Sequence, residues 1–354
     1  MSQLKVDTIT DEAGTGATDF PNGASVAGNN LPTGGPLAGF RNAIINGNFD
    51  IWQRGTSFSG AQYGADRWIN NVLGSSPTQS RQAFALGQTD VPNEPEYFAR
   101  TVVSSVAGAG NIASLQHRVE GVRVFAGQTV TLSFWAKADA AKNIAVELQQ
   151  NFGGGGSPSA TVFGIGGVKY AIGTAWQKLV MTVAVPSISG KTLGTDGNDR
   201  LVLNIIFDAG SDFDARTNSL GHQSGTFDIA QVQLEAGSVA TPFERRPVGT
   251  ELALCQRYYW ESTNTNLTGA WGAFYSNTAG RVWTKFTQQM RAVPALSYSN
   301  LNFDRVGLGG STAASISGTI VDTQGVSFDG IGLPSTTVGT PLGYMGIITA
   351  DAEI

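Results

Sequence analysis

Apolar residues along this chain recur in short runs that alternate with polar residues and are separated by glycine-rich turns. In the run 176–185 the alternation extends over most of the segment, so one face of a strand is expected to be buried. Many short strands joined by such turns indicate a sandwich of two sheets. The other strands predicted in this region are 41–50 with an Asn46-Gly47 turn, 122–125, 130–137, 144–148, 201–207 and 227–234.

The segment 248–354 opens with apolar residues at helical spacing. Leu252, Cys255 and Tyr259 lie on one side of such a helix, and Thr250 is placed to cap its N-terminus. We therefore predict a short helix that connects two β domains. The strands predicted for the second domain are 282–286, 295–298, 316–321, 325–328 and 343–350.

Residues 1–36 differ from the rest of the chain. Leu4 and Val6 alternate with polar residues in one short strand, and glycines and prolines follow. A segment of this composition cannot bury a core of its own. It is either a flexible leader or a peptide that is ordered by docking onto something larger. The fold class that follows is all-β: an extended N-terminal segment (1–36), a sandwich (37–247), a short connecting helix and a small C-terminal β domain (248–354).

Composition narrows the possible partners. Only 14% of the 354 residues are charged, against about a quarter in ordinary soluble domains, and the 46 glycines are roughly twice the usual share. The net charge of −5 gives no long-range attraction to nucleic acid or to an anionic membrane. No apolar run approaches the roughly 20 residues of a membrane span. We therefore expect no nucleic acid partner and no membrane insertion, and the single cysteine allows no internal disulfide.

Catalytic residues are not predicted, and the chain is not expected to be an enzyme. It has two histidines, and His222 lies near Ser224 in a polar loop without a Gly-x-Ser-x-Gly elbow. Cys255 has no histidine near it in sequence and is expected to be a buried small hydrophobe. No phosphate-binding or dinucleotide-binding loop is present, so no cofactor is expected.

A metal site is also not predicted. Asp208, Asp212 and Asp214 follow a strand, and clustered carboxylates suit Ca²⁺. Their spacing does not match an EF-hand loop, so we interpret them as a solvated acidic turn.

Aromatic side chains are the remaining surface chemistry, since flat rings stack on sugars. Trp135 and Trp176 lie in strong strand patterns and are expected in the core. Trp271, Phe274 and Tyr275 stand among small residues. They are our candidate contacts with a carbohydrate or receptor, and the alternative is that these rings pack between subunits.

Four short motifs of the sandwich region resemble carbohydrate-binding modules of the jelly-roll type. They are Asn-Gly-Asn-Phe at 46–49, Ser-Phe-Trp-Ala-Lys at 133–137, Trp-Gln-Lys at 176–178 and Val-Gln-Leu-Glu at 232–235. The resemblance implies a jelly-roll fold. Many such modules have Ile-Asp-Asp in the closing strand, which helps hold a structural calcium. Here the matching residues are Ile229, Ala230 and Gln231, so no metal is carried over.

A second resemblance concerns the order of segments along the chain. The segments 227–237, 240–247, 251–259 and 290–296 follow one another as in the distal part of tail fibres of tailed bacteriophages. The segments 5–9 and 19–23 resemble the head-proximal ends of such fibres. The resemblance implies a homotrimer made in the host cytoplasm and carried on the virion tail. Residues 1–36 would attach to a tail adaptor, nozzle or baseplate protein, with Leu4, Val6, Ile9 and Phe20 as the candidate contacts.

Three classes of function stay open. The first is a structural fibre that contacts a host surface glycan or protein through its distal domains, mainly residues 261–354. The second is a virion-borne polysaccharide depolymerase or esterase. The third is a head fibre or decoration protein without a receptor role.

Overall fold

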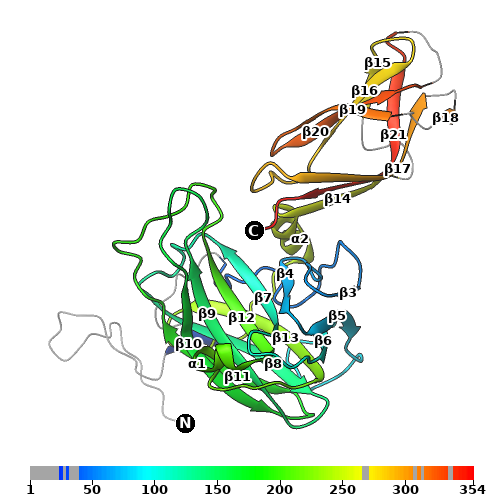
Figure 1. Ribbon diagram of the computed structural model, residues 1–354. Coiled ribbons are helices and arrows are strands. Elements are labelled where there is room, and N and C mark those ends of the chain that lie inside the picture. Colours follow the sequence, from blue (N-terminus) through cyan, green and yellow to red (C-terminus); the bar gives the residue numbers. More distant parts are fainter. Residues whose placement is uncertain are drawn as a thin grey trace, which may run out of the picture.

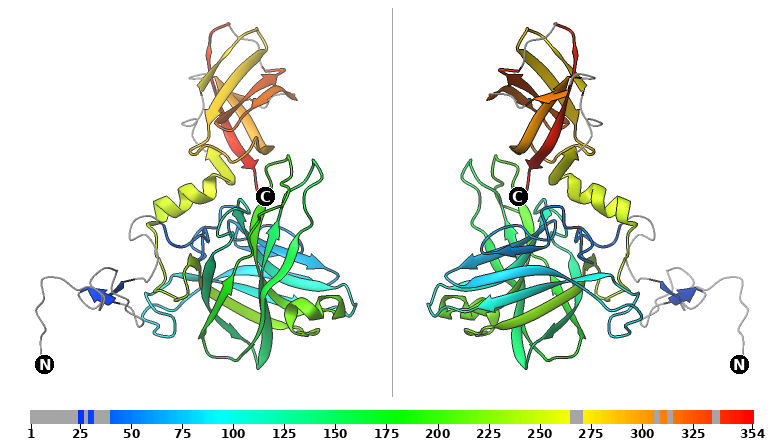
Figure 2. Two further views of the ribbon diagram at one scale, coloured as in Figure 1. Left: turned by 90° about the vertical axis from the view of Figure 1, so that its left-hand side faces the viewer. Right: turned by 90° about the vertical axis from the view of Figure 1, so that its right-hand side faces the viewer.

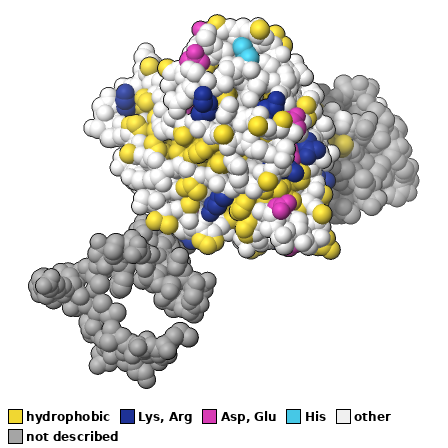
Figure 3. All heavy atoms as spheres, turned by 90° about the horizontal axis from the view of Figure 1, so that it is seen from below, with side chains coloured by type: hydrophobic (Ala, Val, Ile, Leu, Met, Phe, Trp, Pro, Cys, Tyr) yellow, Lys and Arg dark blue, Asp and Glu magenta, His cyan; other side chains and the backbone are white. Residues whose placement is uncertain are grey.

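The computed structural model describes residues 24–26, 29–31, 40–264, 271–305, 309–311, 315–333 and 338–354. It is nearly all β, with a large sandwich and a smaller C-terminal β structure joined through one helix, α2 (Val248–Gln256) (Figures 1 and 2). No helix in the described ranges is long and apolar enough to cross a membrane. The face drawn in Figure 3 carries few charged side chains, in keeping with the low charge of the sequence.

Two antiparallel sheets form the sandwich. The five-stranded sheet has the order β10-β9-β12-β7-β4, and the six-stranded sheet has the order β11-β8-β13-β6-β5-β3. Sequence neighbours are often not sheet neighbours, which is the crossing pattern of a jelly roll. The strands are β3 (Ser57–Ser59), β4 (Trp68–Leu73), β5 (Ser76–Ala83), β6 (Tyr97–Ser104), β7 (Ile112–Glu120), β8 (Thr129–Ala138), β9 (Lys142–Asn151), β10 (Val162–Ile172), β11 (Gln177–Ala184), β12 (Arg200–Ala209) and β13 (Gly225–Ala236).

The core lies between these sheets and is built by alternation. In β8 the side chains of Leu132 and Phe134 point inward and are fully buried, while Ser133 and Trp135 face outward. In β12 Leu203 and Ile205 point inward, and Asn204 between them faces outward. Each strand therefore contributes one face to the core and one to an outer surface. The predicted strands at 130–137, 144–148, 176–185, 201–207 and 227–234 are confirmed.

Two predicted strands are wrong. Residues 122–125 form a tight turn, because Phe125 has a left-handed backbone (φ 61°) and Gln128 N–H donates to the Phe125 carbonyl at 2.9 Å. Residues 41–44 belong to no strand, although the Ala43 N–H donates to the Leu234 carbonyl at 2.9 Å, and the Asn46-Gly47 turn is present. Gly47 is required there, because a Cβ at this position would lie 2.1 Å from the Val232 carbonyl oxygen.

The connecting helix is confirmed, but its predicted start is wrong. Helix α2 begins after Pro247, and no side chain caps it, so Thr250 lies inside the first turn. Pro247 has an extended backbone and fixed geometry that suit the residue before a helix. Tyr258 and Tyr259 follow the helix, and Tyr259 starts the next strand.

The C-terminal structure is one eight-stranded antiparallel sheet with its own core. The order is β18-β17-β21-β15-β16-β20-β19, and β14 pairs with β21 on the side opposite β17. Its buried side chains include Trp260, Phe328 and Tyr344. The strands are β14 (Tyr259–Asn264), β15 (Trp271–Phe274), β16 (Ala279–Lys285), β17 (Ala295–Arg305), β18 (Gly309–Ser311), β19 (Ser315–Val321), β20 (Gly325–Ile331) and β21 (Pro341–Asp351).

Charged contacts join this sheet to the sandwich. Arg67 is fully buried and pairs with Glu353, which follows β21. Arg257, after α2, makes hydrogen bonds of 3.1 and 2.9 Å to the carboxylate of Glu120 at the end of β7. The end of the chain thereby rests against the sandwich near β7, close to the surface described next.

Near the N-terminus, the structure describes only β1 (Ala24–Val26) and β2 (Asn29–Leu31), which pair antiparallel. Leu4, Val6, Ile9 and Phe20 lie outside the described residues.

Candidate functional site: a polar groove on the five-stranded sheet

The outer face of the five-stranded sheet carries a groove of about 340 Å³. Strands β4, β7, β12, β9 and β10 contribute its floor in that spatial order, and the short helix α1 (Asp214–Thr217) lies against β9, β10 and β12. The lining residues are Asn71, Val72, Leu73, Ile112, Gln116, Arg118, Gln149, Asn151, Phe163, Arg200, Val202, Asn204, Phe213 and Arg216.

A row of polar side chains crosses the middle of the groove. Asn204 of β12 is paired with Gln116 of β7 on one side and with Glu147 of β9 on the other. Directly opposed residues in antiparallel strands point to the same face, so the three side chains lie next to one another. Gln149 is two residues further along β9 and shares that face.

The carboxylate of Glu147 is fully buried and holds neighbouring side chains of this row in place. It accepts hydrogen bonds from Gln149 Nε2 at 2.7 Å, Asn204 Nδ2 at 3.2 Å and the Gly164 N–H at 2.7 Å. Arg216 of α1 pairs with it through Nε (3.2 Å) and Nη2. A buried carboxylate with this many donors is held in one position, so Gln149 and Asn204 are oriented before any ligand arrives.

Aromatic rings border the row on the β10 and α1 side. The Phe163 side chain of β10 is 52% exposed, and the guanidinium of Arg216 lies 4.4 Å from the centre of its ring. Phe213, just before α1, is half-buried and also lines the groove. At the other end, Arg118 and Arg200 project from the adjacent strands β7 and β12.

This arrangement suits a sugar. Amide groups donate to and accept from ring hydroxyls, and guanidinium groups donate to them, in fixed geometry, while an exposed ring covers the apolar face of a pyranose. The Oδ1 atom of Asn204 is buried and has no hydrogen-bond partner in the described part of the chain. Buried polar atoms in proteins normally have a hydrogen-bond partner. The Oδ1 atom on the floor of the groove is therefore an acceptor that the fold itself leaves unused.

The residues singled out from the sequence lie elsewhere. Trp271 belongs to β15. Phe274 is only 2% exposed and packs in the C-terminal core, which leaves its ring no face for stacking. Tyr275 is 50% exposed and donates from its hydroxyl to Asp329 at 3.3 Å. A hollow of about 530 Å³ lies there, lined by Ala273, Phe274, Tyr275 and Arg281.

Trp135 and Trp176 were expected in the core, and that expectation is wrong. Both are half-buried on the outer face of the six-stranded sheet. Trp135 lines a second hollow of about 460 Å³ with Phe243 and Lys178, while Trp176 packs against Phe84 and Phe98. This hollow lacks the row of anchored amides found in the groove.

The histidine loop does not form a catalytic triad. The buried carboxylate of Asp208 accepts from Ser75 Oγ at 2.6 Å and from Ser105 Oγ at 2.8 Å, and it lies 3.0 Å from His222 Nδ1. Ser105 therefore donates to the carboxylate and approaches His222 only at Nδ1, at 3.4 Å. A triad needs the serine on the opposite ring nitrogen, Nε2. Here Nε2 faces the main chain of Gly108 instead.

No group of three or more His, Cys, Asp or Glu side chains is placed to hold a metal within the described ranges. Asp208 is taken up by the serine and histidine contacts above. Cys255 is fully buried, and burial raises the pKa of its thiol well above the ordinary value.

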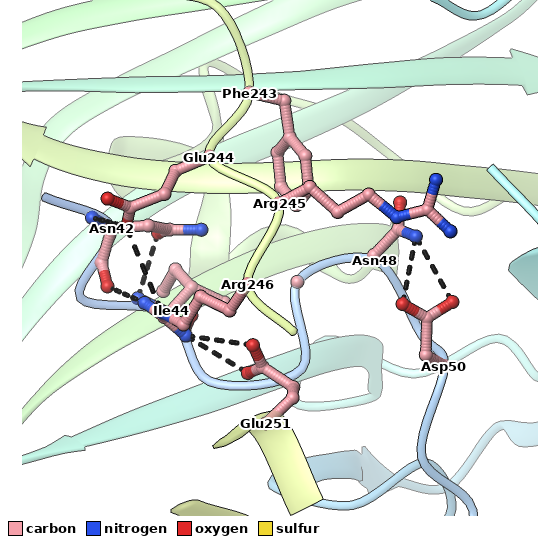
Figure 4. Close-up of a pocket in the computed structure, with 10 residues that line it drawn as sticks. Asn42, Ile44, Asn48, Asp50, Phe243, Glu244, Arg245, Arg246 and Glu251 are labelled. Carbon is pink, nitrogen blue, oxygen red and sulfur yellow. Dashed lines mark hydrogen bonds and ion pairs between the residues drawn. The ribbon is translucent and has the colours of Figure 1, made fainter. Parts of the chain in front are cut away.

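The segment 240–247, which contributes to the resemblance to phage fibres, has a structural role (Figure 4). Arg246 is buried and pairs with Glu251 of α2 at 3.0 Å while its other nitrogen donates to the Asn42 carbonyl. Glu244 accepts from the Asn42 N–H at 2.9 Å. The space among these groups is about 10 Å³, too little for a ligand, so the motif ties α2 to the sandwich.

The groove escaped the sequence prediction because its residues come from distant strands. One signal was present: Asn204 interrupts the apolar run 201–207, and a polar residue in such a run faces either a partner or a site. Glu147 interrupts the run 144–148 in the same way, whereas Gln116 and Gln149 stand next to other polar residues.

Comparison with known proteins bears on the sandwich only. Residues 73–197 match a sequence family described as a carbohydrate binding domain. No curated protein matches the chain. Among solved structures, a CBM4 module is 18% identical, covering 55% of this chain and 99% of the module, with a TM-score of 0.30. The CBM22-2 xylan-binding domain of Xyn10C from Paenibacillus barcinonensis is 15% identical, covering 51% and 99%, with a TM-score of 0.31.

The enzymatically active domain of tailspike protein 4 of bacteriophage CBA120 is 14% identical, with a TM-score of 0.30. The likeness covers 55% of this chain and only 21% of the tailspike chain. With all three TM-scores below 0.5, these structures add no weight to a functional assignment. The family match supports a carbohydrate-binding role, and half of the groove-lining residues lie within the matched range.

Proposed function

We propose that this protein binds a surface glycan through the polar groove of its sandwich, as a fibre carried on the tail of a phage particle. The observation that carries the glycan part is the row of Gln116, Asn204 and Gln149, bordered by the exposed ring of Phe163. The buried Glu147 orients Asn204 and Gln149. A preorganised set of amides beside an aromatic face binds sugar hydroxyls without first paying an ordering cost. The family match over 73–197 supports the same reading.

The receptor contact accordingly moves from residues 261–354 to the sandwich. In the C-terminal sheet Phe274 is buried, and Tyr275 and Arg281 are both engaged with Asp329. The groove offers more free hydrogen-bonding groups and an open aromatic face. In this proposal the C-terminal sheet extends the fibre, and the host glycan binds to the outer face of the five-stranded sheet of the sandwich.

The phage assignment rests on the order of sequence motifs described above. Residues 1–36 would attach the protein to an adaptor, nozzle or baseplate component, and the assembled fibre would be a homotrimer. Virions produced with a protein that lacks residues 1–36 should contain none of that protein. The purified truncated protein should have the same melting temperature as the full chain. Immunogold labelling of virions tests the position: label on the head would support the head-fibre alternative.

Glycan binding is tested with a panel of immobilised oligosaccharides and two matched variants. Phe163→Ala removes the exposed ring of the groove, and Val180→Ala removes an exposed apolar side chain on the opposite sheet. We expect Phe163→Ala to weaken binding about tenfold, which corresponds to about 1.4 kcal/mol, and Val180→Ala to leave it unchanged. Binding that survives Phe163→Ala unaltered would remove the groove as the site.

The enzyme alternative has a separate readout. Incubating the purified protein with host polysaccharide should release no new reducing ends and no acetate if the protein only binds. Release of either product would favour the depolymerase or esterase class, and its dependence on Glu147 or His222 would then locate the chemistry.

A further inference from the structure

The outer face of the six-stranded sheet, opposite the groove, carries the hollow beside Trp135. Its volume is about 460 Å³, against about 340 Å³ for the groove. Two aromatic rings from different segments line it: Trp135 of β8 and Phe243, which follows β13. Both side chains are half-buried. Among the described residues that line the hollow, only Lys178 carries a charge, and it is exposed.

A bulge in β13 lies at this hollow. Between Ala230 and Gln233, β13 has one residue more than the stretch of β8 that it faces. Gln231, inside the bulge, has a left-handed backbone (φ 49°), which is a strained conformation for a residue with a Cβ. Val232 still packs in the core, whereas Gln231 lines the hollow. The bulge therefore adds one amide to the outer face of the sheet, and bulges occur often beside binding sites.

The amide of Gln231 is held through its nitrogen alone. The side chain is 4% exposed, and Nε2 donates to the Pro92 carbonyl at 2.6 Å. Within the described part of the chain, Oε1 of Gln231 has no hydrogen-bond partner, and neither has the hydroxyl of Ser133, which is 3% exposed and also lines the hollow. Buried polar groups normally have partners, so the hollow presents two groups that a polar ligand would satisfy.

Phe243 is fixed in place by the main chain around it. Gln233 of β13 is fully buried, and its Nε2 donates to Thr241 Oγ1 at 3.0 Å. Its Oε1 accepts from the Glu244 N–H at 2.7 Å. The chain on both sides of Phe243 is thus fastened to β13, and a contact surface that is ordered in advance costs less to bind.

We propose that this hollow is a second glycan site, which binds a neutral pyranose on the sheet opposite to the groove. An aromatic ring covers the apolar face of the sugar, while its hydroxyls pair with Gln231 Oε1 and Ser133 Oγ. A purely apolar partner would leave these two groups buried and unpaired. The inference adds a site to the proposed glycan-binding function, and one molecule then holds two glycan strands on opposite faces.

The test places fluorotryptophan in the full-length protein and follows Trp135 by fluorine NMR. Trp135→Phe identifies its resonance, and Trp283→Phe identifies that of Trp283, which is 48% exposed on the C-terminal sheet and serves as the control. The probes are maltohexaose, cellohexaose, xylohexaose and mannohexaose, each at about 10 mM, well above the millimolar Kd of a weak site. We expect at least one of them to shift the Trp135 resonance and to leave that of Trp283 in place.

The same spectra can overturn the inference. If all four hexasaccharides leave the Trp135 resonance fixed, the hollow is no glycan site, whatever the groove binds. If the two resonances move alike, the sugars act on exposed rings in general, and the inference fails as well.

A matched pair of variants locates the sugar. Phe243→Ala should raise the Kd read from the Trp135 resonance about tenfold. Leu86→Ala is the control and should leave it unchanged, because Leu86 is fully exposed and does not line the hollow. An unchanged Kd in Phe243→Ala would show that the sugar does not occupy the space between these segments.

The Phe163→Ala variant separates this inference from the proposed function. The response of Trp135 should persist in it, because the groove lies on the other sheet. If the response disappears, it is transmitted from the groove, and the inference fails while the proposed function stands. If the response persists but binding to the immobilised panel does not depend on Phe163, the groove is removed and the hollow remains as the glycan site.

Discussion

His117 lies in the interior of the sandwich. A histidine in such a place usually has a hydrogen-bond partner for each of its two ring nitrogens. It is fully buried, its ring meets Trp68 edge-on at 5.0 Å, and Nε2 lies 3.1 Å from the main-chain nitrogen of Ile45. Nδ1 has no partner in the described part of the chain. Burial, reinforced by the charge of Arg67, holds the pKa of His117 well below its ordinary value.

The stability of the protein should therefore fall as pH decreases below about 6.5, the ordinary pKa of an unfolded histidine. Above that pH both states hold His117 neutral, whereas below it the unfolded state takes up the proton first. The loss is about 1.4 kcal/mol per pH unit for one proton. Denaturant titrations at pH 7.5, 6.5 and 5.5 measure it, and His117→Gln should flatten this slope. An unchanged slope in the variant would assign the pH dependence to the carboxylates.

Cys255 illustrates a buried thiol with no chemistry. Its side chain is fully buried on α2, and burial raises the pKa of the thiol. Because the thiolate is the reactive form, we expect no reaction with a thiol reagent at pH 8 in the folded protein. One equivalent should react after denaturation. Rapid labelling of the native protein would show that α2 opens readily.

At the scale of elements, the tail after β21 joins the two β structures. Arg67 is fully buried, and its charge is compensated by Glu353. Asp351 also approaches the sandwich, at 3.4 Å from Arg54, but its side chain is 43% exposed. The two carboxylates therefore lie in the same tail in very different environments.

Glu353→Ala should cost about 3–5 kcal/mol, because it leaves a buried guanidinium without its counter-charge. Asp351→Ala is the matched control and should cost about 1 kcal/mol or less, as exposed pairs do. Chemical denaturation of the two variants measures the difference. Similar losses in both would show that Arg67 finds another partner or water.

Substitution of alanine for two different glycines is expected to change the stability in opposite directions. At Gly47 a Cβ would meet the Val232 carbonyl oxygen at 2.1 Å, so Gly47→Ala must displace the turn from β13 and should cost about 1–3 kcal/mol. At Gly249 in α2 a Cβ meets nothing within 4 Å. Gly249→Ala should stabilise the helix by up to about 1 kcal/mol. Thermal melting of both variants checks the pair, and a stabilising Gly47→Ala would contradict the described turn.

At the scale of the whole molecule, the connecting helix gives no separate reason to expect a trimer. An uncovered apolar face with Leu252, Cys255 and Tyr259 would need cover from other subunits. Within one chain Cys255 is already fully buried and Tyr259 is only 7% exposed. The resemblance to phage fibres is the reason that remains. We still predict the mass of three chains by light scattering at micromolar concentration, and a monomer mass would contradict it.

The sequence was most informative where local patterns agree with the final packing. Alternation in 176–185 and the apolar run 201–207 both predict strands, and these strands are present. The same reasoning failed at 122–125, where a positive φ at Phe125 turns the chain and no sequence pattern reveals it. It also misplaced Trp135, because alternation predicts that a strand has two faces without saying which of them is covered.

By itself the sequence determined the all-β class, the helix that links two β structures, the low charge, and the lack of an internal disulfide, because these depend on periodicity and composition alone. Only the tertiary structure decided where a ligand can bind. Gln116, Gln149 and Asn204 become neighbours through the order β9-β12-β7, and Phe274 becomes buried through the closure of the C-terminal sheet. Sheet order depends on long-range pairing of strands, and that pairing is set by the fit of the entire core.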